Sequence, residues 1–399
     1  MKKYFSNFLV FSFFNLIVLT FVACNNSDSE SFLISFDIHN SEQLPFSEIA
    51  EKIRIIELSL PENQFVSEFG LAKMYNNYFF ISTKGNPPYI FVFDSLGNFK
   101  NRIGNFGKGP GEYQRITSFL IDTGSEYVEI LSLNDQKKIT YDFDGNFVNE
   151  DNHPRWGGEA FEKNEGDYVV YYGFLKWVSD YLLKIFDALT LHEKFKAIEV
   201  PDNQVPFLQV VDLFNFSEYN NELLFWHAVG REIYSISEGT FRKKYQIDFG
   251  SNNIPENILK KNFNNVKEFF DEVWGKGYGF LMGGAGETER YLIMRGSKSK
   301  AFYHFIYDKK EDKKYVFDRF FDDLLFHQVW DIDFTRLTLI LVKDNKLYFT
   351  IPGNDLYKLI QNFNPTESYE QTHNYRSHDF LGSVSEMDHP YLVEITLKK

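Results

Sequence analysis

The side chains best suited to ligand binding in this sequence are Trp, Arg and His residues spread over several separate stretches. An aromatic ring offers a flat platform for a sugar or a peptide, and Arg pairs with a carboxylate or phosphate through two parallel hydrogen bonds. The candidates for such a binding face are Arg155, Trp156, Trp177, His227, Arg231, Arg295 and Trp330. Their neighbours His153, Lys176, Trp226, Lys298 and His327 belong to the same stretches. Two structural roles remain open for them: a Trp can wedge between packed elements, and an Arg can pair with a local acid.

The Gly-rich stretch at residues 104–112 is the most distinctive short motif. A phosphate-binding loop needs Gly-Lys-Ser/Thr at the start of a helix, but here Pro110 and Gly111 follow Lys108 and the next segment resembles a strand. We therefore interpret this stretch as a connection that needs unusual backbone angles. The side chains of Lys108 and Glu112 remain candidates for the binding face.

Other motifs of catalysis or metal binding fail on spacing. Residues 142–153 begin like a calcium-binding loop, but their sixth position is Phe147 and their twelfth is His153. The sequence contains neither an H-E-x-x-H zinc motif nor a G-x-S-x-G nucleophile motif. We therefore predict no catalytic residue, no metal ion and no cofactor.

A repeated turn indicates which elements position the candidate residues. Residues 93–99 read Phe-Asp-Ser-Leu-Gly-Asn-Phe, and residues 141–147 read Tyr-Asp-Phe-Asp-Gly-Asn-Phe. Such a unit ends one strand, turns tightly and begins the next. Looser copies occur at residues 185–195, 233–241, 306–308 and 356–358, which gives six copies in total. Because a four-stranded unit every 40–50 residues or so is typical of a propeller blade, we predict an all-β, six-bladed β-propeller of four-stranded antiparallel blades.

The propeller is expected to occupy residues 51–399 as a single domain. The long interval in the fifth blade contains a helical pattern at about residues 253–275, which we interpret as an insertion. Residues 51–60 or 391–397 are candidates for the strand that closes the ring. In a propeller, the starts of the inner strands and the loops between second and third strands share one face, and the candidate residues map to that face.

The N-terminus has the pattern of an export signal. Lys2 and Lys3 precede an apolar stretch, and Cys24 follows small residues before a polar run. Cys24 is the only cysteine, and its position resembles the lipobox of bacterial lipoproteins. We predict a signal peptide at residues 1–23, lipidation of Cys24 and a linker at residues 24–50. Asp28 and Glu30 favour an outer-membrane location weakly, and the side of that membrane stays open.

The charge balance narrows the choice of partners. The formal net charge is −14, and the sequence has no block rich in Lys and Arg. A protein that binds nucleic acid needs a basic face to neutralise phosphates, so we predict no nucleic-acid partner. Anionic lipids would repel the acidic body, so contact with a membrane is expected through the lipid anchor alone. We expect a monomer.

Four features together resemble a known family, the six-bladed β-propeller lipoproteins of Gram-negative bacteria, which are related in shape to TolB-like and NHL-like propellers. The features are the lipobox at Cys24, the Gly-rich stretch at residues 103–113, Ile-Pro-Glu at residues 254–256, and the ending at residues 388–393. In that ending His389 stands where the family usually has Asn. The resemblance implies a propeller in the cell envelope and brings no reaction.

Two functions remain open at this point. The first is a lipid-anchored binding or scaffold protein that holds a protein, peptide or glycan ligand at its loop face. The alternative is a metal-assisted enzyme of the lactonase or lyase type with a site at the centre of the propeller. The first is favoured because no motif brings two carboxylates, or a His and an Asp, together.

Overall fold

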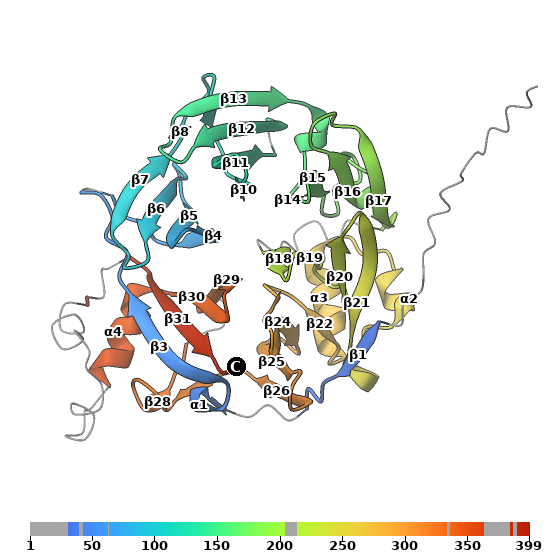
Figure 1. Cartoon of the computed structure of the whole chain (residues 1–399). Helices are drawn as coiled ribbons and strands as arrows, with labels where there is room; N and C mark the ends of the chain where they lie inside the picture. The colour runs from blue at the N-terminus through green and yellow to red at the C-terminus, as the bar shows by residue number, and fades with distance from the viewer. Residues whose placement is uncertain are drawn as a thin grey trace, which may run out of the picture.

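The fold is a ring of β-sheets around a central axis. The computed structural model describes residues 31–399 except 40–42, 63, 134, 204–213, 333–335, 363–383 and 386–388. In most sheets the first strand lies nearest the axis and the later strands lie progressively farther out (Figure 1). The prediction of an all-β propeller with mainly four-stranded antiparallel blades is confirmed.

The first three blades are regular four-stranded sheets. The first contains β4 (Phe69–Tyr75), β5 (Tyr78–Thr83), β6 (Ile90–Asp94) and β7 (Phe99–Ile103). The second contains β10 (Ser118–Asp122), β11 (Tyr127–Ser132), β12 (Lys137–Asp142) and β13 (Phe147–Asn152). The third contains β14 (Ala160–Asn164), β15 (Asp167–Tyr171), β16 (Tyr181–Asp187) and β17 (Glu193–Glu199).

The next two blades have five strands each. The fourth contains β18 (Phe216–Tyr219), β19 (Glu222–Phe225), β20 (Glu232–Ser237) and β21 (Thr240–Asp248), to which β1 (Phe32–Ser35) adds a parallel outer strand. The fifth contains β22 (Gly279–Leu281), β23 (Gly286–Glu287), β24 (Tyr291–Lys298), β25 (Ala301–Asp308) and β26 (Lys313–Phe317).

The predicted number of six blades is wrong. Among the described residues, seven sheets have three or more strands, and six of them have four or five. The remaining sheet has three short strands, β2 (Leu44–Pro45), β27 (Phe320–Asp322) and β28 (Gln328–Val329). Strands of two or three residues are too short to show an alternating pattern, so this sheet leaves no repeat in the sequence.

The last blade closes the ring with both ends of the chain. It contains β29 (Thr338–Lys343), β30 (Lys346–Ile351), β31 (Tyr391–Leu397) and β3 (Ala50–Ile56), in that order. Both candidate closing segments are therefore used, because β31 pairs with β30 on one side and with β3 on the other. The strand expected at residues 356–358 is instead part of helix α4 (Gly353–Gln361).

Part of the predicted linker at residues 24–50 belongs to the folded ring. Besides β1 and β2, it contains the short helix α1 (Phe46–Ile49). Phe36, Ile38 and Phe46 in this segment are buried, and the Phe46 ring stacks on Phe320 with centroids 4.4 Å apart. Cys24 and the predicted signal peptide lie outside the described residues.

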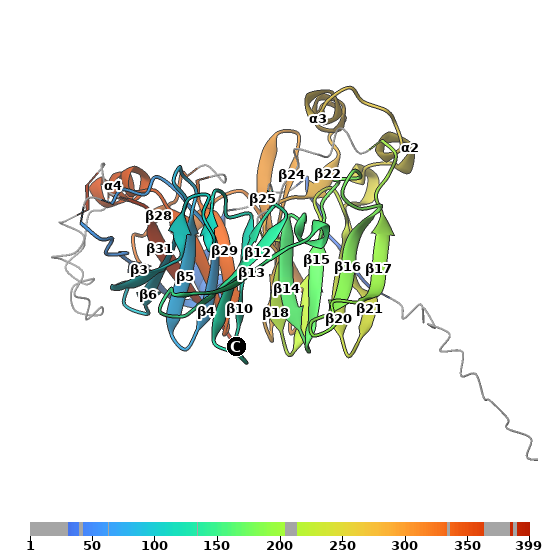
Figure 2. The same ribbon diagram turned by 90° about the horizontal axis from the view of Figure 1, so that it is seen from above.

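The predicted insertion in the fifth blade is helical, but it consists of two helices. These are α2 (Glu256–Leu259) and α3 (Val266–Gly275), and they follow a 3-10 turn at Gly250–Asn252. The Oδ1 atom of Asn265 caps α3 by accepting the backbone N–H of Glu268 at 3.0 Å. Both helices lie on the same side of the ring as α4 (Figure 2).

The repeated turn of the sequence is the hairpin between the third and fourth strands. Asp94 Oδ1 accepts the backbone N–H groups of Leu96 and Asn98 at 3.0 and 2.9 Å, and Asp142 does the same for Asn146 at 2.8 Å. Gly97 and Gly145 have φ values of 89° and 87°, which residues with a Cβ rarely adopt. These hydrogen bonds and glycines explain why the motif recurs.

The hydrophobic core lies mainly between neighbouring sheets. One apolar cluster joins the second and third blades through Leu120, Leu131, Phe161 and Val170. Another joins the last and first blades through residues such as Ile56, Phe79 and Tyr348. Because each blade buries both faces against its neighbours, the inner-strand starts and the loops are the parts left for binding.

Candidate functional site

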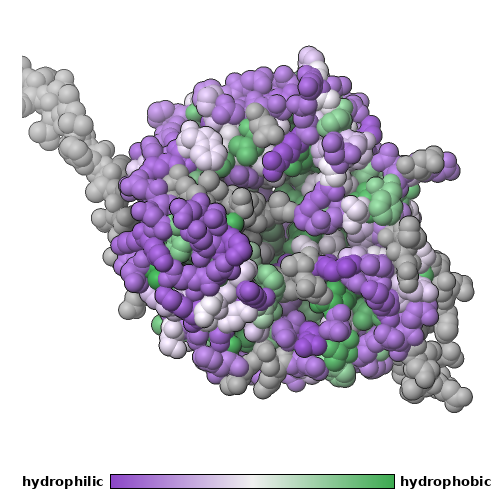
Figure 3. Space-filling model, turned by 180° about the vertical axis from the view of Figure 1, so that it is seen from behind, coloured by the Kyte–Doolittle hydropathy of each residue, from purple (hydrophilic) through white to green (hydrophobic). Residues whose placement is uncertain are grey.

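The two faces of the ring carry different connections. The upper face, defined as the side of α3 and α4 in Figure 2, carries the loops between second and third strands and the starts of most inner strands. The lower face carries the turns between first and second strands and between third and fourth strands. Figure 3, seen from behind the view of Figure 1, shows the upper face, which is largely hydrophilic and hollowed near its middle.

The predicted Trp platforms are mostly part of the core. Trp156 and Trp330 are fully buried, and their indole N–H groups donate to Asp151 at 2.7 Å and to Asp322 at 3.1 Å. Trp156 lies edge-on to Phe161 and Tyr168 between the second and third blades. These residues wedge between elements, and the prediction that they contact a ligand is not supported by their positions.

Arg295 and His227 are also held inside the fold. Arg295 is only 4% exposed, and its Nη2 donates to the carbonyl of Leu337 at 3.2 Å, which links the fifth blade to the last. His227 lies beside the rings of Phe174 and Phe225. Burial lowers the pKa of the His227 imidazole below 6.5, so this side chain is uncharged at neutral pH.

The remaining candidates have local contacts or are exposed to solvent. Arg155 donates from Nε to His153 Nδ1 at 3.1 Å and lies over the Trp156 ring. Arg231 is half-buried, and its backbone N–H donates to Glu232 at 3.1 Å. Trp177 projects into solvent with 71% of its surface exposed. None of the seven candidates lines either of the two upper-face pockets found among the described residues.

The first of these pockets lies between the first and second blades. It has a volume of about 540 Å³, and its walls are the start of β4, the end of β5 with the loop after it, and the segment that leads into β10. The polar and aromatic side chains that line it are Ser82, Thr83, Lys84, Asn86, Phe106, Gln114, Arg115, Thr117 and Ser118. We call it the Arg115 pocket.

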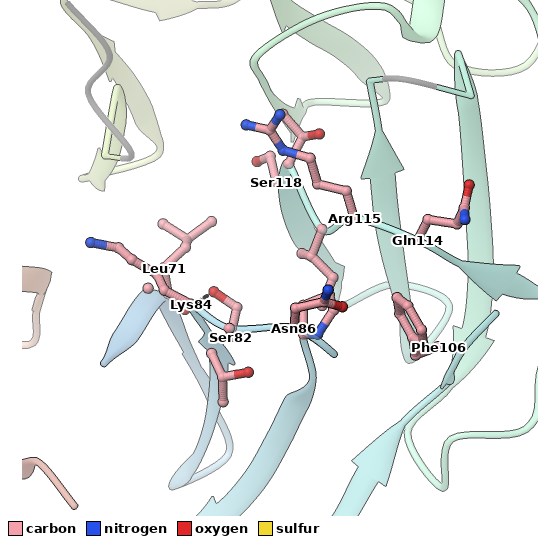
Figure 4. A pocket seen from close by; sticks show the side chains of 14 residues that line it. Leu71, Ser82, Lys84, Asn86, Phe106, Gln114, Arg115 and Ser118 are labelled. Carbon is pink, nitrogen blue, oxygen red and sulfur yellow. Dashed lines mark hydrogen bonds between the residues drawn. The ribbon is translucent and has the colours of Figure 1, made fainter. Parts of the chain in front are cut away.

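The charged groups of this pocket lie toward one end of it. In Figure 4 the Lys84 amine and the Arg115 guanidinium extend to the same side, and Phe106 and Gln114 lie at the other side. Lys84 forms an ion pair with Glu68. Arg115 is exposed and has no hydrogen bond or ion pair with any other residue that the structure describes. Its five N–H donors are therefore available to a ligand.

The Gly-rich stretch positions the outer wall of the pocket. It contains two short parallel strands, β8 (Asn105–Phe106) and β9 (Glu112–Tyr113). Gly104 and Gly111 have positive φ values of 69° and 68°, and a Cβ at Gly111 would collide with the Phe147 ring. The expectation of a connection with unusual backbone angles is thus confirmed. Glu112 accepts the backbone N–H of Gly109 at 2.8 Å and so holds the loop itself.

The carboxyl group of Glu159, in the connection between the second and third blades, interacts electrostatically with Arg115. Glu159 lies just before β14, and its backbone N–H donates to Tyr171 at 2.7 Å. Burial raises the pKa of the Glu159 carboxyl, and the positive charge of Arg115 acts in the opposite direction. The pocket therefore has a cation without a bonded partner in the described part of the chain, and the electrostatic field of this cation reaches a partly buried acid.

A second upper-face pocket lies on the other side of the first blade, between that blade and the last. Its volume is about 450 Å³, and we call it the Phe65 pocket. Its lining includes Phe65, Ser67, Glu68, Arg336, Thr338, Thr350 and Asn354. Here Arg336 is already bonded, to Asp355 at 2.6 Å and to Asn354 at 2.7 Å.

The sequence prediction of a binding face did not include Arg115. Lys84 and Arg115 lie where that prediction places binding residues, in a loop between second and third strands and directly before an inner strand. In the segment that leads into the second blade, the sequence pattern favoured Lys108 and Glu112 rather than Arg115. The available signal was Gln114-Arg115, two polar residues directly before an apolar inner strand.

Within the described part of the chain, no group of three or more His, Cys, Asp and Glu side chains is arranged to hold a metal ion. Within the same residues, no helix combines the length and the apolar character needed to cross a membrane.

Comparisons with known proteins agree on the fold. A family model described as "Domain of unknown function (DUF4934)" matches residues 31–396. A solved structure of a Bacteroides fragilis protein, described as a candidate exported protein, has a TM-score of 0.71 at 19% identity and covers 92% of this chain and 100% of its own. A DUF4221 family member from Bacteroides vulgatus has a TM-score of 0.50 at 11% identity, with 88% and 97% covered. No curated protein sequence matches this chain.

Proposed function

The chain belongs to the DUF4934 family, and we propose that it is an exported binding protein that holds an anionic ligand at its upper face. The observation that carries this proposal is Arg115, which has no hydrogen-bond or ion-pair partner among the described residues and lines a pocket of about 540 Å³. Pockets of several hundred Å³ with a few convergent polar groups are typical of small-molecule sites. The ligand group would be a carboxylate or a phosphate, because both accept two parallel hydrogen bonds from a guanidinium.

The surroundings of Arg115 suit a polar ligand rather than a purely apolar one. Ser82, Thr83, Asn86, Gln114 and Ser118 offer hydroxyl and amide groups on the walls. The Ser82 hydroxyl donates to the Leu71 carbonyl at 3.2 Å and keeps its lone pairs for a ligand. Thr83 Oγ1 accepts the backbone N–H of Tyr89 at 2.9 Å, so its own O–H remains a donor. Phe106 adds an apolar surface that is 41% exposed.

Export and anchoring are part of the same proposal. The apolar N-terminal stretch that ends at Cys24 supports secretion with a lipid at that residue. The likeness to a candidate exported protein is consistent with this location. If Cys24 carries the anchor, a Cys24→Ser variant leaves the membrane fraction of cells, whereas a variant that stays in that fraction contradicts lipidation.

Binding is tested by titrating the purified protein with glucuronate and with inorganic phosphate in a calorimeter. We expect at least one of these anions to bind, and Arg115→Gln to weaken that binding about tenfold or more, because a charge-assisted bidentate contact contributes about 1.5–3 kcal/mol. Lys343→Gln is the matched control, since it removes one positive charge at the lower face.

The outcomes separate the possibilities. Equal affinity in wild type and Arg115→Gln, or a similar loss in Lys343→Gln, would show that Arg115 does not form the site. No binding of either anion would overturn the proposal. Binding of phosphate alone would identify the phosphate form of the ligand.

A further inference from the structure

The Arg115 pocket and the Phe65 pocket meet at the first blade. Lys84 lines the Arg115 pocket, and Glu68 lines the Phe65 pocket. The two side chains form an ion pair, and the Lys84 backbone N–H donates to the Glu68 carbonyl at 2.9 Å. The two pockets therefore share a boundary at this residue pair, and a ligand longer than one ring could reach from one to the other.

The two pockets offer similar uncharged groups. Each has an exposed Phe ring, Phe106 at 41% and Phe65 at 66%. Each also has an amide side chain, from Asn86 or Asn354, and at least two hydroxyl groups. Sugar rings present C–H groups that pack on aromatic faces, and their hydroxyls bond to amides and hydroxyls. A run of sugars can therefore use the same kinds of contact in both places.

The charges of the two pockets differ. Arg115 is unpaired among the described residues, so its pocket has a free positive charge. In the Phe65 pocket the charge of Arg336 is neutralised by Asp355, and that of Glu68 is neutralised by Lys84 of the neighbouring pocket. A ligand that fits both pockets thus has an anionic unit next to an uncharged polar unit.

We propose that the two pockets form one extended site for an oligosaccharide, with a carboxylate-bearing sugar at Arg115 and an uncharged sugar at Phe65. This inference rests on the proposed binding function and specifies its ligand. A glycan is favoured over an acidic peptide because the uncharged lining of both pockets is rich in hydroxyl and amide groups. Acidic side chains at successive positions of a peptide would place a second carboxylate in the Phe65 pocket, where Arg336 is already paired with Asp355 and is not available to receive it.

The test compares ligands of increasing length on the purified protein. Hyaluronan oligosaccharides of two, four and six sugars alternate glucuronate with uncharged N-acetylglucosamine, and chitin oligosaccharides of equal length lack the carboxylate. We expect the hyaluronan tetrasaccharide to bind about tenfold or more tightly than glucuronate alone, since the second unit adds contacts at little further entropic cost. The chitin oligosaccharides are expected to bind more weakly at every length.

A variant of each pocket separates the two subsites. Phe65→Ala is expected to weaken tetrasaccharide binding about fivefold and to leave glucuronate binding unchanged, whereas Arg115→Gln weakens both. Leu96→Ala is the matched control, because Leu96 is as exposed as Phe65 but lies in the lower-face hairpin after β6. Circular dichroism verifies that each variant folds.

Three results would overturn the extended site alone. One is an affinity that does not rise with oligosaccharide length, and another is a Phe65→Ala variant that binds the tetrasaccharide as well as wild type does. Tighter binding of a Glu-rich peptide than of the tetrasaccharide would assign the surface to a peptide. If glucuronate or phosphate still binds through Arg115 in these cases, the proposed function stands while the extended site falls. If none of the anions binds, both fall.

Discussion

The upper and lower faces of the ring differ in how their charged residues are paired across blades. At the lower face, Lys73 of β4 pairs with Glu162 of β14, and Lys163 of β14 pairs with Asp122 of β10. Lys343 of β29 also pairs with Glu218 of β18, at 3.1 Å. Each pair joins inner strands of different blades. At the upper face, Arg115 precedes β10 and has no such partner among the described residues.

This difference shows that pocket size alone does not identify the site. The lower face has a larger pocket of about 730 Å³, lined by Glu218, Glu287, Glu289, Asp344, Lys343 and Lys399 among others. Its acids outnumber its bases, and Glu287 is already bonded to Lys309 at 2.7 Å and to Lys244 at 2.9 Å. The lower face therefore stabilises the ring, while the smaller upper pocket retains a charge for a ligand.

The largest effect that we predict is a loss of stability at a lower-face hairpin. Gly97 has a positive φ, and a Cβ there would overlap the carbonyl oxygen of Glu57, which follows β3. We expect Gly97→Ala to lower the free energy of unfolding by about 3 kcal/mol or more, since about 1–2 kcal/mol of backbone strain is added to the overlap. Urea denaturation measures the change.

Gly166→Ala is the matched control for this prediction. Gly166 also has a positive φ, of 83°, but a Cβ there meets no atom within 4 Å. We expect it to lose only about 1 kcal/mol, the strain alone. Equal losses of stability in the two variants would mean that the hairpin at Gly97 does not pack against the last blade, to which β3 belongs. Weaker anion binding by folded Gly97→Ala protein would contradict the assignment of stability to the lower face and of binding to the upper face.

A smaller effect is predicted for the pH dependence of anion binding at the upper face. Burial raises the pKa of the Glu159 carboxyl above 4.5, so this group takes up a proton as the pH falls from neutral toward its pKa. The loss of its negative charge near Arg115 strengthens the binding of an anion. We expect an increase of about threefold, the scale of a solvent-screened charge interaction.

The measurement is a glucuronate titration from pH 7 down to pH 4.5 in wild type and in Glu159→Gln. The variant is expected to bind more tightly at pH 7 and to lose the part of the pH dependence that belongs to Glu159. Because the ligand titrates equally in both experiments, the difference isolates the protein group. Parallel pH profiles would show that Glu159 does not act on the bound anion.

The repeated structure was predictable because it rests on local hydrogen bonds. The Asp-x-x-Gly turns at Asp94 and Asp142 need a fixed spacing, which the sequence displays directly. Residues 356–358 were predicted as a strand from three residues alone, but they belong to helix α4. Pro352 before this helix and the buried Leu356 and Leu359 are typical of a helix start and an apolar helix face. The three-stranded sheet was not predictable, because its parallel pairing of β2 with β27 joins residues almost 280 positions apart.

The candidate site was only partly predictable. The face follows from blade topology, but the sequence does not show which side chains the blades bury. Trp156 and Trp330 are buried in the core. Burial of a large aromatic ring stabilises the fold when its N–H group also donates to an acceptor, as both indoles do here. Arg115 lies in no motif, and its value as a candidate comes from the lack of a partner among the described residues, which only the folded arrangement reveals.

The central claim is that the upper face binds a carboxylate through Arg115. A crystal structure of the protein with the hyaluronan tetrasaccharide tests it most directly. We expect a glucuronate carboxylate about 2.7–2.9 Å from the Arg115 guanidinium, with the neighbouring sugar beside Phe65. A tetrasaccharide bound at the lower face, or bound at the upper face without a contact to Arg115, would show that Arg115 does not form the site.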